Sequence, residues 1–478
     1  MVFARAPSIA SRRRSVNPHA RLRVFTKGVG VSARGWLVVL LVLAAVALAG
    51  LAFFRAEGTP PVLIAPPSLV VSASGRDVEI AASDAGSGVR ELAAVFSHAA
   101  GDREVALELY PGSWLRGGDA GADRSLTVRI DPKALGAAEG GGFLRVTARD
   151  WSWRGGFGGN QTRLEVPVTI DLTAPRVAVA SGLTYVERGG SGAVAYSVSE
   201  PTARDGVQVG ERFYRGVPRP GSSDPNARIA IFAVATDAPP APPIRVVAED
   251  AAGNTAAASW SVVLKERQFQ RANITLPQSF LDNKVPELAQ QEKLPAASPI
   301  ETFQTINSKL RAENEARIRE LAAADDSEKH WKGAFQQLHN SQVTSVFAER
   351  RSYFVDGTQV SEATHYGYDL AATANTPITA SNAGRVLFAG LLGIYGNCVL
   401  VDHGMGITSL YAHLSRIDVR EGESVAQGQT LGLSGQTGLA GGDHLHFAIL
   451  VGDTYVDPVE WWDAKWVESH VESQLQVR

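Results

Sequence analysis

Hydrophobic and polar residues follow different patterns in successive parts of the chain, and the first pattern is one long apolar run. Residues 35–54 are uncharged and dominated by leucine, valine and alanine, with Arg34 and Arg55 on either side. At about 1.5 Å per residue, a helix of this length spans roughly 30 Å, which is the thickness of a bilayer core. We therefore expect a transmembrane helix at 35–54 rather than a buried core helix.

The residues around this run indicate its orientation. Residues 1–34 carry eight basic side chains and no acidic one. Such an excess of positive charge places the N-terminus in the cytoplasm and the rest of the chain outside the membrane. A cleaved signal peptide is the alternative, because Ala47-Leu48-Ala49 offers a small-residue cleavage site. We prefer a retained anchor, since the apolar run continues past that site.

From residue 60 to about 265 the pattern changes to short alternating runs rich in β-branched residues and separated by turn residues. This pattern predicts two antiparallel β-sandwiches, at 60–172 and 173–265. An internal repeat supports the division: LRVTARD at 144–150 returns as IRVVAED at 244–250, and each copy precedes a turn ending in Gly-Asn. This ending resembles the last hairpin of bacterial immunoglobulin-like domains. Acidic turn residues could bind calcium, but solvated turns explain them more simply.

Residues 266–340 have the pattern of a helical connector. Ser298, Pro299 and Glu301 form a capping-box sequence with proline at the first helical position. Apolar residues then recur at near-helical spacing, which predicts a helix near 299–324. Its intermittent apolar stripe suggests packing against a neighbouring domain or an envelope protein partner.

Histidines are concentrated in the next segment, where five of the ten in the chain lie. In the run 443–450, alternation along a strand would place His444 and His446 on one face, opposite a core-facing set of apolar residues. His365 and Asp369 are four residues apart and would share one face of an extended strand. A histidine, an aspartate and a ligand from the His444–His446 pair would form a three-ligand site with an open fourth position, which is typical of catalytic zinc.

The order of these motifs resembles a known family. His365-x-x-x-Asp369, YAHL at 411–414 and HLHF at 444–447, separated by Gly-rich strands, resemble the lysostaphin-like (LytM-type) zinc endopeptidases of peptidoglycan over residues 341–460. The resemblance implies an antiparallel β-domain that binds Zn²⁺ through His365, Asp369 and His446. It also implies that His413 and His444 face the open position as acid-base or oxyanion groups, without showing which is the principal base.

Several residues of this segment have simpler explanations. His403 taken alone is better explained as an ordinary polar residue of a strand end. Asp443 stands where the family often has proline, and it is a turn residue that could orient an adjacent imidazole. Ala448 stands where the family often has an acidic residue, but neither position is a ligand position. The single cysteine, Cys398, excludes an intrachain disulfide and is expected to be buried in a strand.

Composition and charge exclude other classes of function. Residues 421–429 resemble a biotinyl or lipoyl hairpin, but no modifiable lysine lies between Lys332 and Lys465. An excess of positive charge is confined to the arm before the apolar run and the rest of the chain is net acidic, so no nucleic-acid partner is expected. A non-hydrolytic relative that regulates another cell-wall hydrolase remains the alternative, although loss of a ligand would be its signature and all three ligands are present.

The sequence therefore predicts a mainly β protein with a single N-terminal membrane helix. Two immunoglobulin-like sandwiches and a helical connector would hold the peptidase domain at 341–460 away from the inner membrane, in the periplasm or cell wall. A tail at 461–478 completes the chain. The predicted activity is zinc-dependent cleavage of the peptide cross-links of peptidoglycan.

Overall fold

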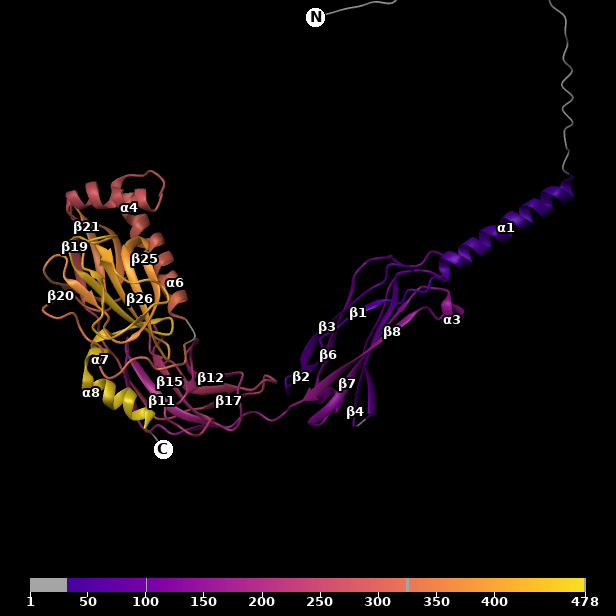
Figure 1. Cartoon of the computed structure of the whole chain (residues 1–478), viewed down its shortest axis with the longest axis horizontal. Helices are drawn as coiled ribbons and strands as arrows, with labels where there is room; N and C mark the ends of the chain where they lie inside the picture. The colour runs from indigo at the N-terminus through magenta and orange to yellow at the C-terminus, as the bar shows by residue number, and fades with distance from the viewer. Residues whose placement is uncertain (1–31, 100, 324–325, 477–478) are drawn as a thin grey trace, which may run out of the picture.

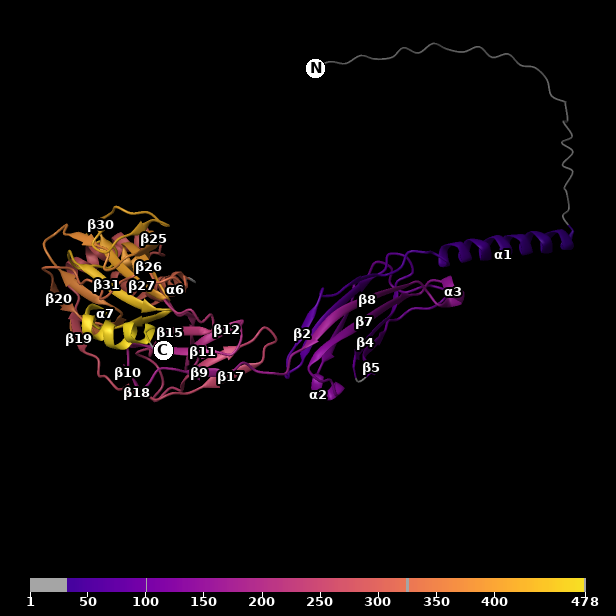
Figure 2. The same cartoon turned by 60° about the horizontal axis from the view of Figure 1, so that its bottom comes forward.

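The computed structural model describes residues 32–99, 101–323 and 326–476 (Figures 1 and 2). The basic segment 1–34, predicted to be cytoplasmic, lies outside these ranges except for its last three residues. Residues 477–478 of the predicted tail also lie outside them.

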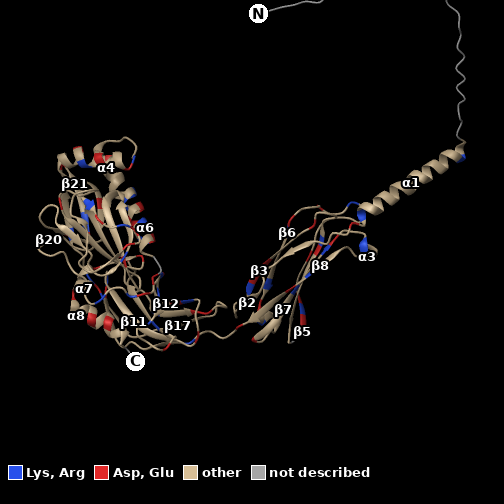
Figure 3. Ribbon diagram, in the orientation of Figure 1, with Lys and Arg blue, Asp and Glu red and all other residues tan. Residues whose placement is uncertain are grey.

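The apolar run forms one helix, α1 (Ala33–Arg55), which begins at the capping hydroxyl of Ser32. Its mean hydropathy of 3.0 and its length suit a bilayer crossing, and none of its most apolar window is buried against other parts of the protein. Figure 3 shows no charged residue along the middle of the helix. The chain thus has an N-terminal apolar helix of the kind that serves as an anchor or a signal.

Two sheets follow α1 and enclose a separate hydrophobic core that includes Ile80, Leu92, Phe96 and Leu144. One sheet contains, in spatial order, β1 (Val62–Ile64), β3 (Arg76–Ser83) and β6 (Arg124–Ile130). The other contains β2 (Leu69–Val71), β8 (Gln161–Ile170), β7 (Gly140–Asp150), β4 (Val89–His98) and β5 (Gly101–Leu109). Short helices α2 (Pro132–Leu135) and α3 (Arg154–Phe157) lie in the connections. The pairing is antiparallel as predicted, except that β2 lies parallel to β8.

The second β-region has two four-stranded sheets and one parallel pair. The first sheet is β14 (Val217–Pro218), β15 (Ala227–Ala233), β11 (Ser191–Val198) and β9 (Val177–Val179). The second is β13 (Arg212–Arg215), β12 (Arg204–Val209), β16 (Ile244–Glu249) and β17 (Thr255–Ala258). The parallel pair is β10 (Thr184–Glu187) and β18 (Val262–Lys265). The sequence repeat is a structural repeat, because β7–β8 and β16–β17 are equivalent antiparallel hairpins. Their immunoglobulin-like character stays a prediction.

The connector consists of β19 (Arg271–Thr275), η1 (Phe280–Lys284) and a run of helices. These helices are α4 (Val285–Gln291), α5 (Pro299–Thr305), η2 (Ile306–Leu310) and α6 (Arg311–Ala322). The last three are consecutive, so the helix predicted near 299–324 is confirmed, as is the capping box of Ser298 and Glu301. Phe303, Ile306 and Ile318 join the core of the C-terminal domain.

The C-terminal domain is built on one eight-stranded antiparallel sheet. Its strands are, in spatial order, β20 (Gln342–Ser345), β23 (Tyr368–Ala371), β31 (Leu445–Val451), β27 (Ile407–Leu414), β26 (Asn397–Gly404), β25 (Gly384–Leu391) and β29 (Ser424–Val425), with β32 (Thr454–Val456) beside β31. One smaller sheet pairs β19 with β21 (Glu349–Val355) and β22 (Thr358–His365). The other holds β24 (Pro377–Thr379), β30 (Thr430–Leu433) and β28 (Arg416–Ile417). Cys398 is buried in β26 as predicted.

The chain ends in short helices that pack against the second β-region. They are α7 (Pro458–Trp462), α8 (Ala464–Trp466), η4 (Val467–Glu472) and α9 (Ser473–Leu475). Trp461 is fully buried, and Ser181 donates to Gln474. One continuous core runs from Val186 to Val471, whereas the first β-region has its own. The second β-region and the C-terminal domain are therefore packed as one body.

Glu460 lies in this contact and should give it a measurable pH dependence. Its carboxylate accepts from the backbone and hydroxyl of Ser191, and burial raises the pKa of Glu460 from its ordinary 4.5 to about 8. The folded state then holds a proton that the unfolded state has lost. Its stabilising contribution is complete below pH 4.5 and disappears as the pH rises to 8.

We expect Glu460→Gln to remove this component, because glutamine keeps the acceptor oxygen but does not titrate. Thermal unfolding measured from pH 5 to 8 should show a smaller fall of Tm in the variant, by about 2–4 °C for each 1 kcal/mol removed. Exposed Glu468, changed to glutamine, is the matched control. Equal slopes in the variant, the control and the parent protein would contradict the assignment.

Candidate metal centre

Strand pairing brings the predicted ligands together from three separate segments. In the β23–β31 ladder Asp369 lies directly opposite His446, and in the β21–β22 hairpin His365 lies opposite Glu349. Only Tyr366 and Gly367 separate β22 from β23, so the chain turns within the motif itself. A Cβ atom at Gly367 would approach the His446 ring to 2.7 Å. Glycine therefore allows His446 to lie against this turn.

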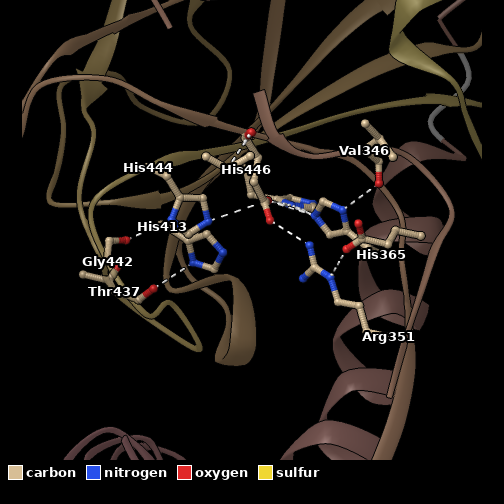
Figure 4. Close-up of polar contacts among 11 residues, drawn as sticks. Val346, Arg351, His365, His413, Thr437, Gly442, His444 and His446 are labelled. Carbon is tan, nitrogen blue, oxygen red and sulfur yellow. Dashed lines mark hydrogen bonds and ion pairs between the residues drawn. The ribbon is translucent and has the colours of Figure 1, made fainter. Parts of the chain in front are cut away.

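Three side-chain atoms converge at the centre of the site (Figure 4). Asp369 Oδ1 is 2.9 Å from His365 Nε2 and 2.9 Å from His446 Nδ1. The two nitrogens are themselves 2.9 Å apart. Each histidine is only 5% exposed. This group of three is compact enough to hold one metal ion.

A hydrogen bond of His365 fixes which of its ring nitrogens faces the centre. His365 Nδ1 lies 3.0 Å from the carbonyl oxygen of Val346. A carbonyl oxygen only accepts, so Nδ1 carries the proton and Nε2 presents its lone pair to the centre. Two imidazole nitrogens and a carboxylate oxygen cannot satisfy one another with a single shared proton. They are the donor set that zinc takes in proteins, so the residues fit this metal.

Asp369 is held from behind by an arginine. Arg351 donates from Nη2 to Asp369 Oδ2 at 2.9 Å and from Nε to Glu349 Oε1 at 2.8 Å. Burial opposes ionisation of Asp369, but the charge and hydrogen bonds of the surrounding histidines outweigh it and hold its pKa well below 3.8. Asp369 is therefore a carboxylate, as a metal ligand must be.

His413 and His444 lie side by side next to this group, with ring centroids 4.8 Å apart. His413 Nδ1 donates to the carbonyl of Thr437 at 2.8 Å, and His444 Nδ1 donates to the carbonyl of Gly442 at 2.9 Å. The Nε2 atom of each ring is thereby left for other partners. His444 Nε2 is 3.6 Å from Asp369 Oδ1.

His413 has a backbone conformation that is rare for a side-chain-bearing residue. Its φ angle is +64°, and the register of β26 and β27 shifts between the pairs next to it. A bulge of this kind redirects a side chain that regular alternation would place elsewhere. Strain of this kind is concentrated at functional sites.

The imidazoles differ in their protonation. Burial, together with the neighbouring His444 and His446, holds the pKa of His413 well below 6.5. Burial lowers the pKa of His446 to about 4. Burial also acts against the charged form of His444, but the nearby Asp369 carboxylate outweighs this and raises the pKa of His444. The pocket thus combines neutral imidazoles with one that favours the charged form.

All five predicted residues line one pocket of about 150 Å³. Sequence reasoning missed three features of it: the arginine support of Asp369, the backbone carbonyls that orient the rings, and Arg311, which reaches the wall from α6. The Asp356-Gly357 dipeptide predicts the hairpin that places β21 beside β22, but the contact of Arg351 with Asp369 on β23 has no signal in the local sequence.

Two other residues have the roles of ordinary structural groups. His403 is completely buried outside the pocket, where its ring nitrogens bond the Ala383 carbonyl and the Ser409 hydroxyl. Asp443 accepts from the Ser434 hydroxyl and from the backbone N–H of Asn375. Neither bond orients an imidazole, so Asp443 fixes the loop before β31.

Fold and site together define a metallopeptidase-like domain. Residues 363–458 match the sequence profile of peptidase family M23. Over these residues the C-terminal domain matches the lysostaphin-like peptidases, and the resemblance seen in the sequence is confirmed.

The matched relatives share this domain. The DD-carboxypeptidase/endopeptidase Mpg of Neisseria meningitidis serogroup B is 42% identical over 130 residues, which is 27% of this chain and 29% of that protein. The peptidoglycan DD-endopeptidase ShyB of Vibrio cholerae is 34% identical over 119 residues, 25% of this chain and 27% of that protein. The chain thus spans less than a third of the length of these curated relatives. A solved structure of a M23 peptidase from Pseudomonas aeruginosa is 24% identical, covers 58% of this chain and 94% of its own, and has a TM-score of 0.37.

Removing the arginine support should loosen the metal centre. We expect Arg351→Met to weaken zinc binding by about 10–100-fold, because Asp369 would lose the partner that orients it. Competition with a chromogenic chelator measures the affinity. Arg350→Met is the matched control, since Arg350 is exposed on the same strand. Unchanged affinity in the Arg351 variant would show that Asp369 needs no such support.

Proposed function

We propose that this protein is a membrane-anchored zinc metalloendopeptidase that cleaves the peptide cross-links of cell-wall peptidoglycan. The observation that carries the proposal is the convergence of His365 Nε2, Asp369 Oδ1 and His446 Nδ1 beside two further imidazoles in one pocket. Family membership supports the reaction class. The relatives named as DD-endopeptidases support a D,D cross-link as the bond that is cut.

His365, Asp369 and His446 would hold the zinc ion, which supplies a Lewis acid for the attacking water and for the scissile carbonyl. The residues around it prepare these ligands. Val346 fixes the tautomer of His365, and Arg351 holds Asp369 as a carboxylate whose Oδ1 faces the centre. Ligands that are held in this way lose little further freedom when metal binds.

His413 and His444 would handle the protons of the reaction. Each uses Nδ1 on a backbone carbonyl, so each can work only through Nε2. One Nε2 accepts a proton from the attacking water, and the other donates to the developing oxyanion or to the leaving amine. Because the two rings lie side by side, both can reach the same peptide group.

The helix α1 would anchor the enzyme in the inner membrane, with the N-terminus in the cytoplasm and the catalytic domain in the periplasm or cell wall. The separate core of the first β-region supports a role as the spacer between membrane and catalytic body. The second β-region and the connector offer surfaces for envelope protein partners. A non-hydrolytic regulator is the alternative, but no ligand is missing from this site.

Substitution of a metal-binding histidine and of a proton-transfer histidine should have different effects on zinc content and activity. His446→Ala should lose zinc and activity together, because a ligand is removed. His413→Ala and His444→Ala should keep zinc and lose about 10²–10⁴-fold in turnover, since each removes a proton-transfer group. Zinc content by atomic absorption and release of cross-linked peptides from peptidoglycan measure the two effects.

Exposed His339, changed to alanine, is the control for loss of a histidine as such. Stoichiometric zinc without turnover in the parent protein would support the regulatory alternative. Loss of zinc from His413→Ala, with His446→Ala still loaded, would overturn the ligand assignment.

The anchor has its own test. We expect the mature protein to be recovered in the membrane fraction and to retain tryptic peptides from residues before Ala47. Mass spectrometry of the purified protein measures this directly. A mature N-terminus at Gly50 would show instead that the helix is a cleaved signal.

A further inference from the structure

A second group of potential metal ligands lies in the first β-region, far along the chain from the zinc centre. Glu57, Asp84 and Asp150 each offer a carboxylate oxygen within 4.8 Å of the others. Glu57 comes two residues after α1, Asp84 follows β3, and Asp150 ends β7. The proposed peptidase reaction uses none of them.

Two of these carboxylates are buried and Glu57 is half-buried, and the group has no matching positive charge. Asp84 is 2% exposed and Asp150 is fully buried. Asp84 Oδ1 has no hydrogen-bond partner, although a buried carboxylate oxygen in this state is costly. Among the described residues, no lysine or arginine forms an ion pair with the group. The nearby Arg55 donates instead to the carbonyls of Trp114 and Trp151.

Backbone donors hold the three carboxylates in place. Asp84 Oδ2 accepts from Gly88 at 2.6 Å, and Glu57 Oε2 accepts from Thr59 at 2.7 Å. Asp150 Oδ1 accepts from the backbone of Ser152 and of Asn160. These bonds position the negative charges but do not neutralise them. Burial and the nearby charge of Asp150 raise the pKa of both Glu57 and Asp84.

The repeat in the second β-region does not bring its acids together in this way. Asp171 corresponds to Glu57, because the Asn254 side chain donates to the Asp171 carbonyl as the Asn160 side chain donates to that of Glu57. Ser199 bonds Arg176 where Ser83 pairs with Val62, so the next residue, Glu200, corresponds to Asp84. Within the described ranges, Asp171, Glu200 and Asp250 form no carboxylate group of this kind. The turns of the repeat therefore do not require that the acids converge, and their convergence in the first copy needs another explanation.

We propose that Glu57, Asp84 and Asp150 bind one calcium ion at the end of the first β-region nearest α1. Three carboxylates form a hard, all-oxygen donor set, and calcium takes six to eight oxygen ligands with flexible geometry. The Asn160 side chain and the Glu57 carbonyl lie within the same hydrogen-bonded cluster. Zinc would be a poor occupant, because the cluster offers neither imidazole nor thiolate.

An ion in this place would connect the exit of α1 to the sheets. Glu57 belongs to the segment that leaves the helix, whereas Asp84 and Asp150 belong to the first β-region, one strand from each of its sheets. Binding would therefore fix the direction in which this region leaves the membrane.

The full-length protein in detergent micelles, stripped of metal and titrated with calcium by calorimetry, tests the proposal. We expect one ion per chain in the parent protein and in a His446→Ala background, which removes the zinc centre as the source. Asp84→Asn and Glu57→Gln should weaken binding at least tenfold. Asp250→Asn, at the matched turn of the second copy, should bind as the parent does. Terbium is a luminescent substitute for calcium, and the adjacent Trp151 should sensitise its emission in the parent and in Asp250→Asn. This emission should fall in Asp84→Asn and Glu57→Gln.

The variants also separate a metal site from a purely structural cluster. Asparagine at position 84 can still accept from Gly88, and removal of a charge relieves repulsion, so Tm without calcium should be unchanged or higher. Calcium should raise Tm in the parent but not in Asp84→Asn. No calcium binding by the parent, tighter binding of magnesium than of calcium, or equal losses in Asp84→Asn and Asp250→Asn would each overturn the proposal.

Discussion

The pairing of β23 with β31 is the constraint on which the site depends. Asp369 and His446 are direct partners in this ladder, so their side chains emerge on the same face of the sheet. A slip of one residue would turn His446 to the opposite face. The apolar partners Tyr368 and Phe447 hold the register, because both are buried on the other side. The hydrophobic pattern of the sheet thus also positions the polar chemistry.

The second β-region, the connector and the C-terminal domain share one continuous core, so they are not separate units joined by linkers. Glu460 and Trp461 from the end of the chain pack on Ser191 of the second β-region. Phe303 and Ile306 of the connector are buried in the same core. These regions therefore move with the site, and Arg311 of α6 forms part of its wall. Among the described β-regions, the first has a core of its own that is separate from this body.

The sequence predicted those features that depend on neighbouring residues, such as the start of a helix or the position of a strand. The capping box at Ser298 predicted the start of α5, and the run 443–450 predicted the strand that carries His446, although this strand begins at Leu445, after His444. Contacts between distant segments were beyond such reasoning. Nothing near Arg351 indicates that it supports Asp369, because a register across two hairpins decides this. The positive φ of His413 is likewise set by a bulge in long-range pairing, not by its neighbours in sequence.

The C-terminal site and the carboxylate cluster of the first β-region both hold negative charge away from water. They differ in the groups that compensate this charge. At the C-terminal site two imidazoles share the centre with one carboxylate, and Arg351 balances part of the charge even without metal. In the first β-region three carboxylates meet with neutral donors alone, which are backbone N–H groups, the Ser87 hydroxyl and the Asn160 amide. Fixed N–H dipoles orient a carboxylate but leave its net charge in place, so repulsion among the three persists. A group of this composition stays together at neutral pH only if protons or a cation supply the missing charge. The first centre is therefore preorganised before metal arrives, whereas the second still needs protons or a cation to balance its charge.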